Sequence, residues 1–282
     1  MNRPQSPKAF SWLIGWAALF AMTLVGCGTV EPESTKSRIT LTGSSTVAPL
    51  ASEIGRRFEE RNSSIRVEVQ TGGSSRGIAD ARSGAATLGM ISRDLAPDEQ
   101  DLTAFTIARD GIGVIVHADN PVEELSRSQI AAIFRGEVRN WSELGGEDSE
   151  ITVVNKAEGR ATLEVFKQYF QLTSPEIRAD VVIGHNEQGV KTVAGNAGAI
   201  GYVSIGVAES DIQQGIAIRL LRIEGMEASI ETVADGSFPI SRPLNLVANG
   251  TVDGPAAELV AFSLSEEVHD LIEAQRFVPS RR

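Results

Sequence analysis

Three segments of this 282-residue chain follow the same order: a short apolar run, a turn of small and hydroxylated residues, and a run with helical spacing. The three turns occupy residues 42–46 (Thr-Gly-Ser-Ser-Thr), 71–77 (Thr-Gly-Gly-Ser-Ser-Arg-Gly) and 155–162 (Asn-Lys-Ala-Glu-Gly-Arg-Ala-Thr). Apolar alternation before a turn is typical of a strand, and four-residue apolar spacing after it is typical of a helix. The repeated order therefore predicts an α/β protein built on an open sheet.

These turns also predict where a ligand binds. Glycine permits a tight turn, and the Ser and Thr hydroxyls join the unpaired N–H groups of the following helix as hydrogen-bond donors. For a single turn, a helix N-cap preceded by glycine is the simpler interpretation. Because ligands in open α/β sheets bind beyond the carboxyl ends of the strands, three such turns can converge on one small anion.

Composition limits the classes of function. Apolar residues make up 41% of the chain, enough for one large domain or two modest lobes, and the net charge is −11. Nucleic acid is therefore not an expected partner. A small anion is compatible with this charge, because backbone dipoles in a cleft act locally while distant surface charge is screened by salt.

The first 27 residues predict export. Arg3 and Lys8 precede an apolar stretch at 10–25, and Leu-Val-Gly-Cys at 24–27 resembles a bacterial lipobox. We therefore expect 1–26 to be a lipoprotein signal peptide, Cys27 to carry the lipid, and 27–38 to be a flexible tether. The protein would be held at the outer side of a bacterial membrane, in the periplasm or on the surface. A single-pass anchor is the alternative, although the apolar stretch is short for one.

The remaining pattern continues the alternation of strands and helices. Leu50, Ile54 and Phe58 place an apolar stripe on a helix at 48–61. Strand-like runs at 105–108 and 112–116 lie on either side of Arg-Asp-Gly at 109–111, and a double run interrupted by glycine in this way suits a crossover between lobes. Further strands are expected at 65–69, 86–91, 151–154, 181–183, 199–203, 216–223 and 244–247, a rigid link at 239–243, and helices at 78–82, 126–134, 162–170, 175–179, 190–194 and 255–275, the last split near Ser265.

Six motifs together resemble the phosphate-binding proteins that feed ABC transporters, over roughly residues 39–280. The resemblance implies a type II periplasmic-binding-protein fold: two α/β lobes joined by two crossover strands, with the ligand in the cleft between the lobes. Lobe one would comprise 39–111 plus 241–282, and lobe two 112–240, with hinges near 109–111 and 241–243. The motifs lie at 43–46, 72–75, 110–112, 133–141, 198–204 and 238–243.

The resemblance also implies the ligand-binding residues. In the third turn this chain departs from the family, which has an Arg followed by Glu-Gly-Ser-Gly-Thr: here Lys156 replaces the arginine and Arg160 is an added cation. We expect Arg160, and secondarily Lys156, to contact the anion; an ion pair of Arg160 with Glu158 or Glu164 is the alternative. The family's phosphate-selecting carboxylate lacks a clear counterpart near 92–94 (Ser-Arg-Asp). The candidates are Ser45, Thr46, Val47 (through its amide), Ser74, Ser75, Ser92, Arg93, Lys156, Arg160, Ala161 and Thr162.

The function implied is capture of phosphate, or of a similar tetrahedral oxyanion, and its delivery to an ABC permease and ATPase by a monomer without cofactor or catalysis. A sugar ligand is disfavoured because aromatic residues are only 5% of the chain, and the three histidines lack metal-site spacing. Two alternatives remain. Residues 73–77 match G-x-S-x-G, so Ser75 with Asp253 and His269 could form a serine hydrolase, and a signalling or adhesion protein could keep the same fold.

Overall fold

The computed structural model describes residues 36–280, which belong to one compact unit. The predicted signal peptide, the lipidation site at Cys27 and most of the tether lie outside the described residues. Within residues 36–280, no helix is both long and apolar enough to cross a membrane.

A mixed sheet runs through the molecule in the order β2-β1-β3-β11-β4-β8-β6-β7, and β9 and β12 pair with β4 off this path. β1 is parallel to β2 and β3, and β6 is parallel to β7 and β8, whereas β4 and β11 are antiparallel to their neighbours. The strands are β1 Ser37–Gly43, β2 Ile65–Thr71, β3 Leu88–Ile91, β4 Leu102–His117, β5 Glu124–Leu125, β6 Thr152–Lys156, β7 Val181–Ile183, β8 Ala199–Ser204, β9 Ile218–Leu220, β10 Arg222–Ile223, β11 Ser241–Asn249 and β12 Val278–Pro279.

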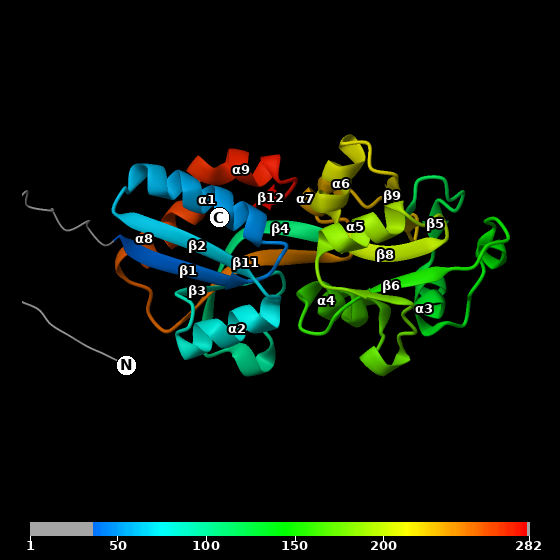
Figure 1. The fold of residues 1–282 in the computed structure, drawn as a ribbon, viewed down its shortest axis with the longest axis horizontal. Helices are drawn as coiled ribbons and strands as arrows, with labels where there is room; N and C mark the ends of the chain where they lie inside the picture. Colours follow the sequence, from blue (N-terminus) through cyan, green and yellow to red (C-terminus); the bar gives the residue numbers. More distant parts are fainter. Residues whose placement is uncertain (1–35, 281–282) are drawn as a thin grey trace, which may run out of the picture. The chain divides into compact units, whose positions relative to one another are not determined.

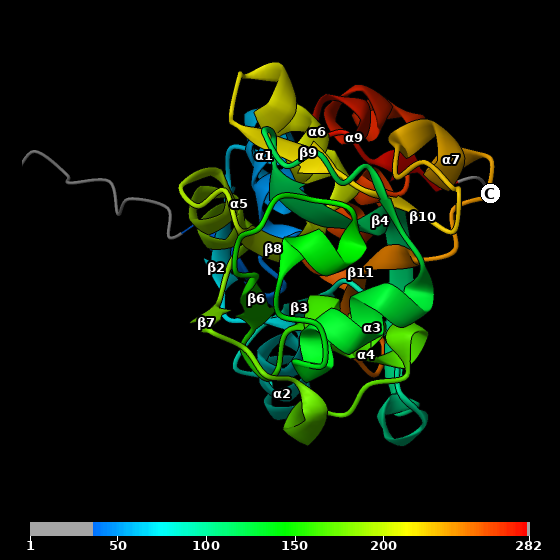
Figure 2. The same cartoon turned by 90° about the vertical axis from the view of Figure 1, so that its right-hand side faces the viewer.

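Helices cover both faces of this sheet, with α1, α9, α5 and α6 on one side and α2, α3 and α4 on the other (Figures 1 and 2). Short 3₁₀ turns occur at Pro97–Glu99, Trp141–Leu144, Ser174–Glu176 and Glu266–Val268. The helices are α1 Ala48–Arg61, α2 Ser74–Ser83, α3 Arg127–Arg135, α4 Ala161–Phe170, α5 Asn186–Ala194, α6 Ile205–Gln213, α7 Ile230–Ala234, α8 Gly254–Ser263 and α9 His269–Ala274.

β4 and β11 link the two halves of the molecule (Figure 1). The two strand-like runs predicted around 109–111 are parts of one 16-residue strand, because residues 109–111 continue the strand between them. The predicted rigid link is also partly strand, because β11 begins at Ser241 and pairs Pro243 with Arg109 of β4. β3 pairs only with Asn245 to Val247, so Pro243 lies beyond it, where its missing N–H costs the sheet no bond.

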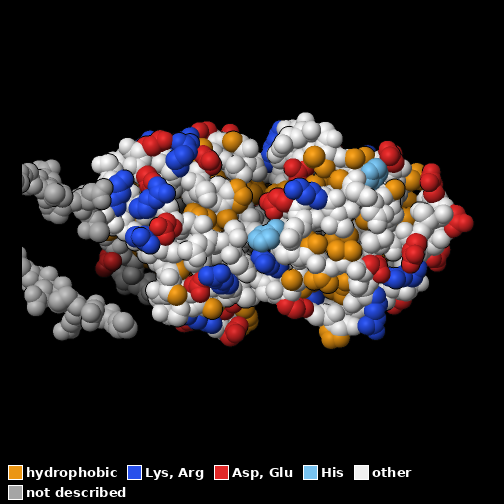
Figure 3. All heavy atoms as spheres, viewed as in Figure 1, with side chains coloured by type: hydrophobic (Ala, Val, Ile, Leu, Met, Phe, Trp, Pro, Cys, Tyr) orange, Lys and Arg blue, Asp and Glu red, His pale blue; other side chains and the backbone are white. Residues whose placement is uncertain are grey.

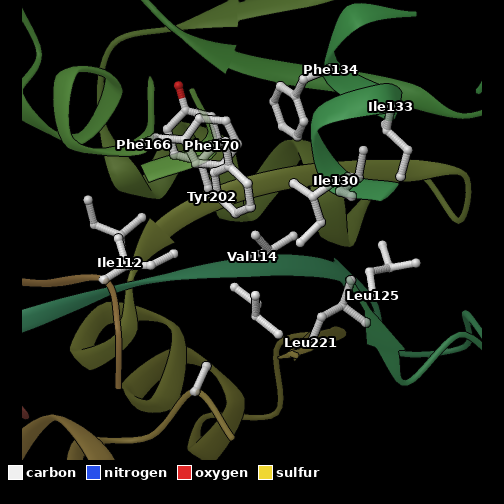
Figure 4. Packing of buried hydrophobic residues seen from close by; sticks show 14 of the residues in the cluster. Ile112, Val114, Leu125, Ile130, Ile133, Phe134, Phe166, Phe170, Tyr202 and Leu221 are labelled. Carbon is white, nitrogen blue, oxygen red and sulfur yellow. The ribbon is translucent and has the colours of Figure 1, made fainter. Parts of the chain in front are cut away.

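Buried apolar side chains gather on either side of this linkage. One cluster draws only on residues between 39 and 108 and between 244 and 277, whereas another draws only on residues between 112 and 240. In the second, Tyr202 of β8 stacks on Phe166 of α4 with ring centroids 3.8 Å apart (Figure 4). We call residues 36–111 with 241–280 lobe one, and residues 112–240 lobe two.

Most predicted elements are present, with corrections at their ends. The helix at Ala48–Arg61 was predicted with its observed bounds, and the helix beginning after Ser126 is confirmed. α5 begins at Asn186, four residues before the predicted start, and the expected helix at 175–179 is only the 3₁₀ turn Ser174–Glu176. α6 and α7 were missed; α6 follows β8 directly, so one apolar run covers both the strand and the helix.

Candidate functional site

The carboxyl ends of β1, β2, β6 and β7 each lead into a helix, and the four turns meet at one small cavity between the lobes. Its volume is about 10 Å³, so the lobes are closed tightly around it. The lining includes the first residues of α2, α4 and α5, whose leading N–H groups have no partner within their own helices. The cavity is lined by Ser44, Ser45, Thr46, Gly73, Ser74, Ser92, Lys156, Arg160, Ala161, Thr162, Gly184 and Asn186.

The first turn is fixed by Gly43 and Ser44. Gly43 has φ +131°, and a side chain there would meet the carbonyl oxygen of Met90 at 2.2 Å, so only glycine fits. The hydroxyl of Ser44 accepts from the amide of Thr46 at 3.2 Å and donates to Ser92 Oγ at 3.0 Å. Thr46 is buried and points its side chain into the network that surrounds the cavity.

The second turn supplies one serine to the cavity and one to the contact between the lobes. Ser74 is buried and its hydroxyl accepts from the amide of Ser92 at 3.2 Å. Ser75 is exposed: its amide donates to the carbonyl of Gly159 at 3.3 Å, and its hydroxyl donates to Glu164 at 3.4 Å. The two serines therefore have different neighbours, as expected for successive residues in the first turn of a helix.

In the third turn, Arg160 is the N-cap residue of α4 and reaches over the cavity. Its Nη1 atom is buried without a hydrogen-bond partner among residues 36–280. The alternative ion pairs are not formed, because Glu158 lies 3.7 Å from Lys167 and Glu164 lies 2.5 Å from Arg93. Arg160 thus presents an uncompensated guanidinium at the site.

Lys156, at the end of β6, is a second cation, and only 3% of its surface is exposed. Its ammonium donates to Asn186 Oδ1 at 2.8 Å, and Asn186 in turn donates to Thr46 Oγ1 at 3.3 Å, across the two lobes. Burial, and after it the positive charge of Arg242, lowers the pKa of Lys156 to about 7. The charge of Glu187 opposes this shift, and Arg160 adds the smallest contribution to it.

Arg242 and Asp110 form a buried ion pair behind the cavity that sequence reasoning did not assign to the site. Their side chains are 1% and 0% exposed, and Arg242 Nη2 donates to Asp110 Oδ2 at 2.8 Å. Arg242 also donates to Thr162 Oγ1 at 2.9 Å and to Ser92 and Thr46 at 3.3 Å each. It therefore ties together hydroxyls from both lobes. The sequence did contain one indication of this pair, because Asp110 and Arg242 are opposite charges in the two predicted crossover segments.

The structure brings most predicted site residues together at the cavity and places three elsewhere. Val47 is in the core of lobe one with its amide donating to Ser44 Oγ at 3.4 Å, and Ser75 lies at the contact between the lobes. Asn186 was missed, although its turn follows a predicted strand. The predicted residues that line the cavity are Ser45, Thr46, Ser74, Ser92, Lys156, Arg160, Ala161 and Thr162.

Arg93 was predicted to contact the ligand, but it faces a different surface. It lines a larger groove of about 670 Å³, together with residues 94–97, 164–165, 168–169 and 239–242. Its hydrogen bond to Glu99, with the nearby charge of Glu164, raises the pKa of Arg93, so its charge is already neutralised by carboxylates. The small cavity is the candidate anion site, because Lys156 and Arg160 have no carboxylate partner among residues 36–280.

The hydrolase alternative lacks its geometry. Within the described part of the chain, the Ser75 hydroxyl has Glu164 as its hydrogen-bond partner, while His269 lines a separate cavity with Thr106 and Ser280. Asp253 is the N-cap residue of α8. No cluster of three potential metal ligands occurs in residues 36–280.

Charge on the visible surface does not explain anion binding, because acidic and basic side chains are interspersed over both lobes (Figure 3). The attraction is local, because Lys156 and Arg160 line the cavity and Arg242 lies directly behind it. The carboxylate of Asp110 offsets Arg242, and the charge of Glu187 acts on Lys156. Cations and aligned amides shielded from water bind an anion more strongly than exposed charges do. The arrangement can hold one small, compact, multiply charged oxyanion.

The family comparison agrees with this geometry. A model described as the PBP superfamily domain matches residues 29–267. The chain belongs to the PBP superfamily. The phosphate-binding protein PstS of Bacillus subtilis is 28% identical over 282 residues, which covers 93% of this chain and 91% of that protein.

Solved structures of this superfamily are similar as well. A phosphate ABC transporter substrate-binding protein from Clostridium perfringens, solved with bound phosphate, has 30% identity and a TM-score of 0.81, covering 87% of this chain and all 100% of that one. An ABC-type phosphate transport receptor from Vibrio cholerae has 28% identity and a TM-score of 0.73, covering 86% and 100%. The predicted type II periplasmic-binding-protein fold and the resemblance to phosphate-binding proteins of ABC transporters are thereby confirmed.

Proposed function

We propose that this PBP captures inorganic phosphate, or a similar tetrahedral oxyanion, at the cavity between its lobes. The observation that carries the proposal is a cavity lined by Lys156 and Arg160, with no carboxylate in its lining among residues 36–280. Arg242 lies behind it and binds hydroxyls of three of the lining residues. Phosphate suits the charge of the site, and the similar proteins from Bacillus subtilis and Clostridium perfringens are described as binding phosphate. We further propose that the protein is a binding protein and not an enzyme.

The contacts support a binding mechanism by lobe closure. Hydrogen bonds from Asn186 to Thr46, from Arg242 to Thr162 and from Ser75 to Glu164 join residues of lobe one to residues of lobe two. An anion that bridges the turns of both lobes would add bonds that exist only in the closed form. We propose that the lobes, 39–111 plus 241–282 and 112–240, close about the crossover segments at 109–111 and 241–243.

Delivery of the anion to an ABC permease and lipid anchoring through Cys27 complete the proposal. Both follow from the resemblance and from the N-terminal sequence, and the protein would act as an extracytoplasmic monomer. Reconstitution of uptake in vesicles that contain the permease and ATPase tests delivery. A protein that binds phosphate but never stimulates uptake would instead have a signalling or adhesion role.

Thermal unfolding tests the ligand. At a free concentration of 100 times Kd, a ligand stabilises its protein by about 2.7 kcal/mol, which for a domain of this size raises Tm by about 5–10 °C. Phosphate and arsenate should produce this shift in the isolated protein, and sulfate and phosphonates define how selective the site is. If none of these anions raises Tm at millimolar concentration, the site does not bind tetrahedral oxyanions.

A further inference from the structure

The hydroxyl oxygens buried around the cavity accept hydrogen bonds from protein groups, which leaves their hydrogens free to donate to a ligand. Thr46 Oγ1 accepts from Arg242 and Asn186, and Thr162 Oγ1 accepts from Arg242. Ser74 Oγ accepts from the amide of Ser92. A hydroxyl whose lone pairs face protein donors turns its own hydrogen the other way, so these groups offer O–H bonds to the cavity.

Other cavity groups are donors as well. The leading amides of α2, α4 and α5 are N–H groups, and Arg160 carries only N–H bonds. The side-chain oxygen of Asn186 already accepts from Lys156. No carboxylate lines the cavity in the part of the chain that the structure describes. A fully ionised oxyanion such as sulfate needs only donors, whereas monohydrogen phosphate also carries a P–OH group that needs an acceptor.

Lys156 is the buried cavity group that can change from donor to acceptor. Its Nζ has one hydrogen-bond partner, Asn186, and no carboxylate within ion-pair distance among residues 36–280. The charged groups that act on it are Arg242 from β11, Arg160 from the start of α4 and Glu187 from α5, and Asp110 of β4 is bound to Arg242. Tyr202 of β8 approaches its backbone amide at 3.3 Å.

We propose that Lys156 selects protonated tetrahedral oxyanions by accepting the hydrogen of the ligand's P–OH group on its neutral amine. This inference rests on the proposed function, and it gives one residue the role of distinguishing monohydrogen phosphate from sulfate. Asn186 is the positioning residue, because its Oδ1 holds Nζ in place at 2.8 Å while its Nδ2 is bound to Thr46. A pKa of about 7 makes the neutral amine available at physiological pH.

The proton count follows from this assignment. When monohydrogen phosphate meets the neutral amine, its hydrogen stays on the ligand oxygen as O–H···N or moves to Nζ as O⁻···H–N⁺. In both cases the complex holds the protons that the two partners brought, and none comes from solvent. Sulfate carries no hydrogen that the neutral amine could accept. Its negative charge therefore favours the protonated form of Lys156, which takes one proton from the buffer.

Calorimetric titration in two buffers of different ionisation enthalpy measures this count directly. At about pH 8.5, above the amine's pKa of about 7, phosphate binding should take up close to zero protons and sulfate binding close to one. Sulfate affinity should also fall by about tenfold per pH unit in this range, whereas phosphate affinity should not. Uptake of a full proton with phosphate would overturn the proposal.

Substitutions distinguish a role of Lys156 in ligand selectivity from a role in stabilising the fold. Lys156→Arg keeps a cation but cannot accept a hydrogen, so the ratio of phosphate to sulfate affinity should drop at least tenfold and sulfate binding should lose its pH dependence. Lys167→Met is the matched control, because Lys167 pairs with Glu158 outside the cavity, and it should keep the wild-type ratio. An unchanged ratio in Lys156→Arg would refute the role of Lys156.

Failure of the proposed function and failure of the variant to fold can each be told apart from failure of this inference. If the wild-type protein binds neither phosphate nor sulfate, the proposed function fails before selectivity is measured. If Lys156→Arg does not fold, the proton count of the wild-type protein decides the question alone, because a lysine that merely supports the structure would give the same count for both anions.

Discussion

Glu164 joins the two lobes outside the anion cavity, and its replacement tests whether closure contributes to affinity. It lies on α4 of lobe two, with Oε2 2.5 Å from Arg93 Nε and Oε1 accepting from Ser75 at 3.4 Å. Both partners belong to lobe one, so these contacts require the closed arrangement. Glu164→Gln keeps the shape of the side chain and removes its charge, and it leaves the cavity lining intact.

The exposure of the pair sets the size of the effect. The side chains of Arg93 and Glu164 are 11% and 32% exposed, between a surface pair and a fully buried one. Arg93 would keep its bonds to Glu99, at 2.6 and 2.8 Å, so no buried charge is left alone. The loss should therefore be about 1 kcal/mol, near the top of the range for exposed pairs, which corresponds to about fivefold weaker binding.

Calorimetric titration with phosphate measures the change, and Glu99→Gln is the matched control. Glu99 binds the same arginine but lies in lobe one with it, so its loss should lower the free energy of unfolding and leave phosphate affinity within twofold of wild type. The reasoning is refuted if Glu164→Gln binds phosphate as tightly as the wild-type protein, or if Glu99→Gln weakens binding equally.

Three further predictions concern other parts of the chain. Arg160→Ala should weaken phosphate binding by about tenfold or more and leave the Tm of the unliganded protein nearly unchanged, because Arg160 contributes a charge-assisted contact to the ligand and no ion pair to the fold; retained affinity with a lowered Tm would contradict this. Asp110→Asn should lower the free energy of unfolding by about 3 kcal/mol in urea, since Arg242 stays buried without its partner, whereas the control Ser204→Ala should cost about 1. Cys27→Ser should move the protein from the membrane to the soluble fraction; unchanged partition with the signal still attached would favour a single-pass anchor.

The local sequence pattern was sufficient to predict most helices and strands and the turns that form the site. Gly43 and Gly73 both have positive φ values in the structure, which is why glycine marked those turns in the sequence. The apolar stripe of α1 predicted its bounds because the helix buries one continuous face. Each of these signals depends on residues that are close together in the chain.

The sequence could not show two features of the site: which surface the side chain of Arg93 faces, and which residues far apart in the chain pair with each other. Ser92 and Arg93 follow β3 directly, where the chain bends, and the serine lines the small cavity whereas the arginine lines the larger groove. Arg242 and Asp110 are directly opposite each other in the pairing of β11 with β4, a relation that exists only after the sheet has formed. No local pattern could show that this pair is buried.

The same buried charges explain why the closed form should depend on its ligand. Lys156, Arg160 and Arg242 lie close together in the closed arrangement, where burial first and then the charges of Arg242 and Arg160 lower the pKa of the lysine. Asp110 forms an ion pair with Arg242 alone. An oxyanion replaces this repulsion with attraction. Because opening the lobes returns these groups to water, the unliganded protein should favour an open form, and phosphate should reduce its radius of gyration in small-angle scattering. A radius that stays the same at saturating phosphate would mean that the interlobe bonds alone overcome the repulsion, and that closure does not depend on the anion.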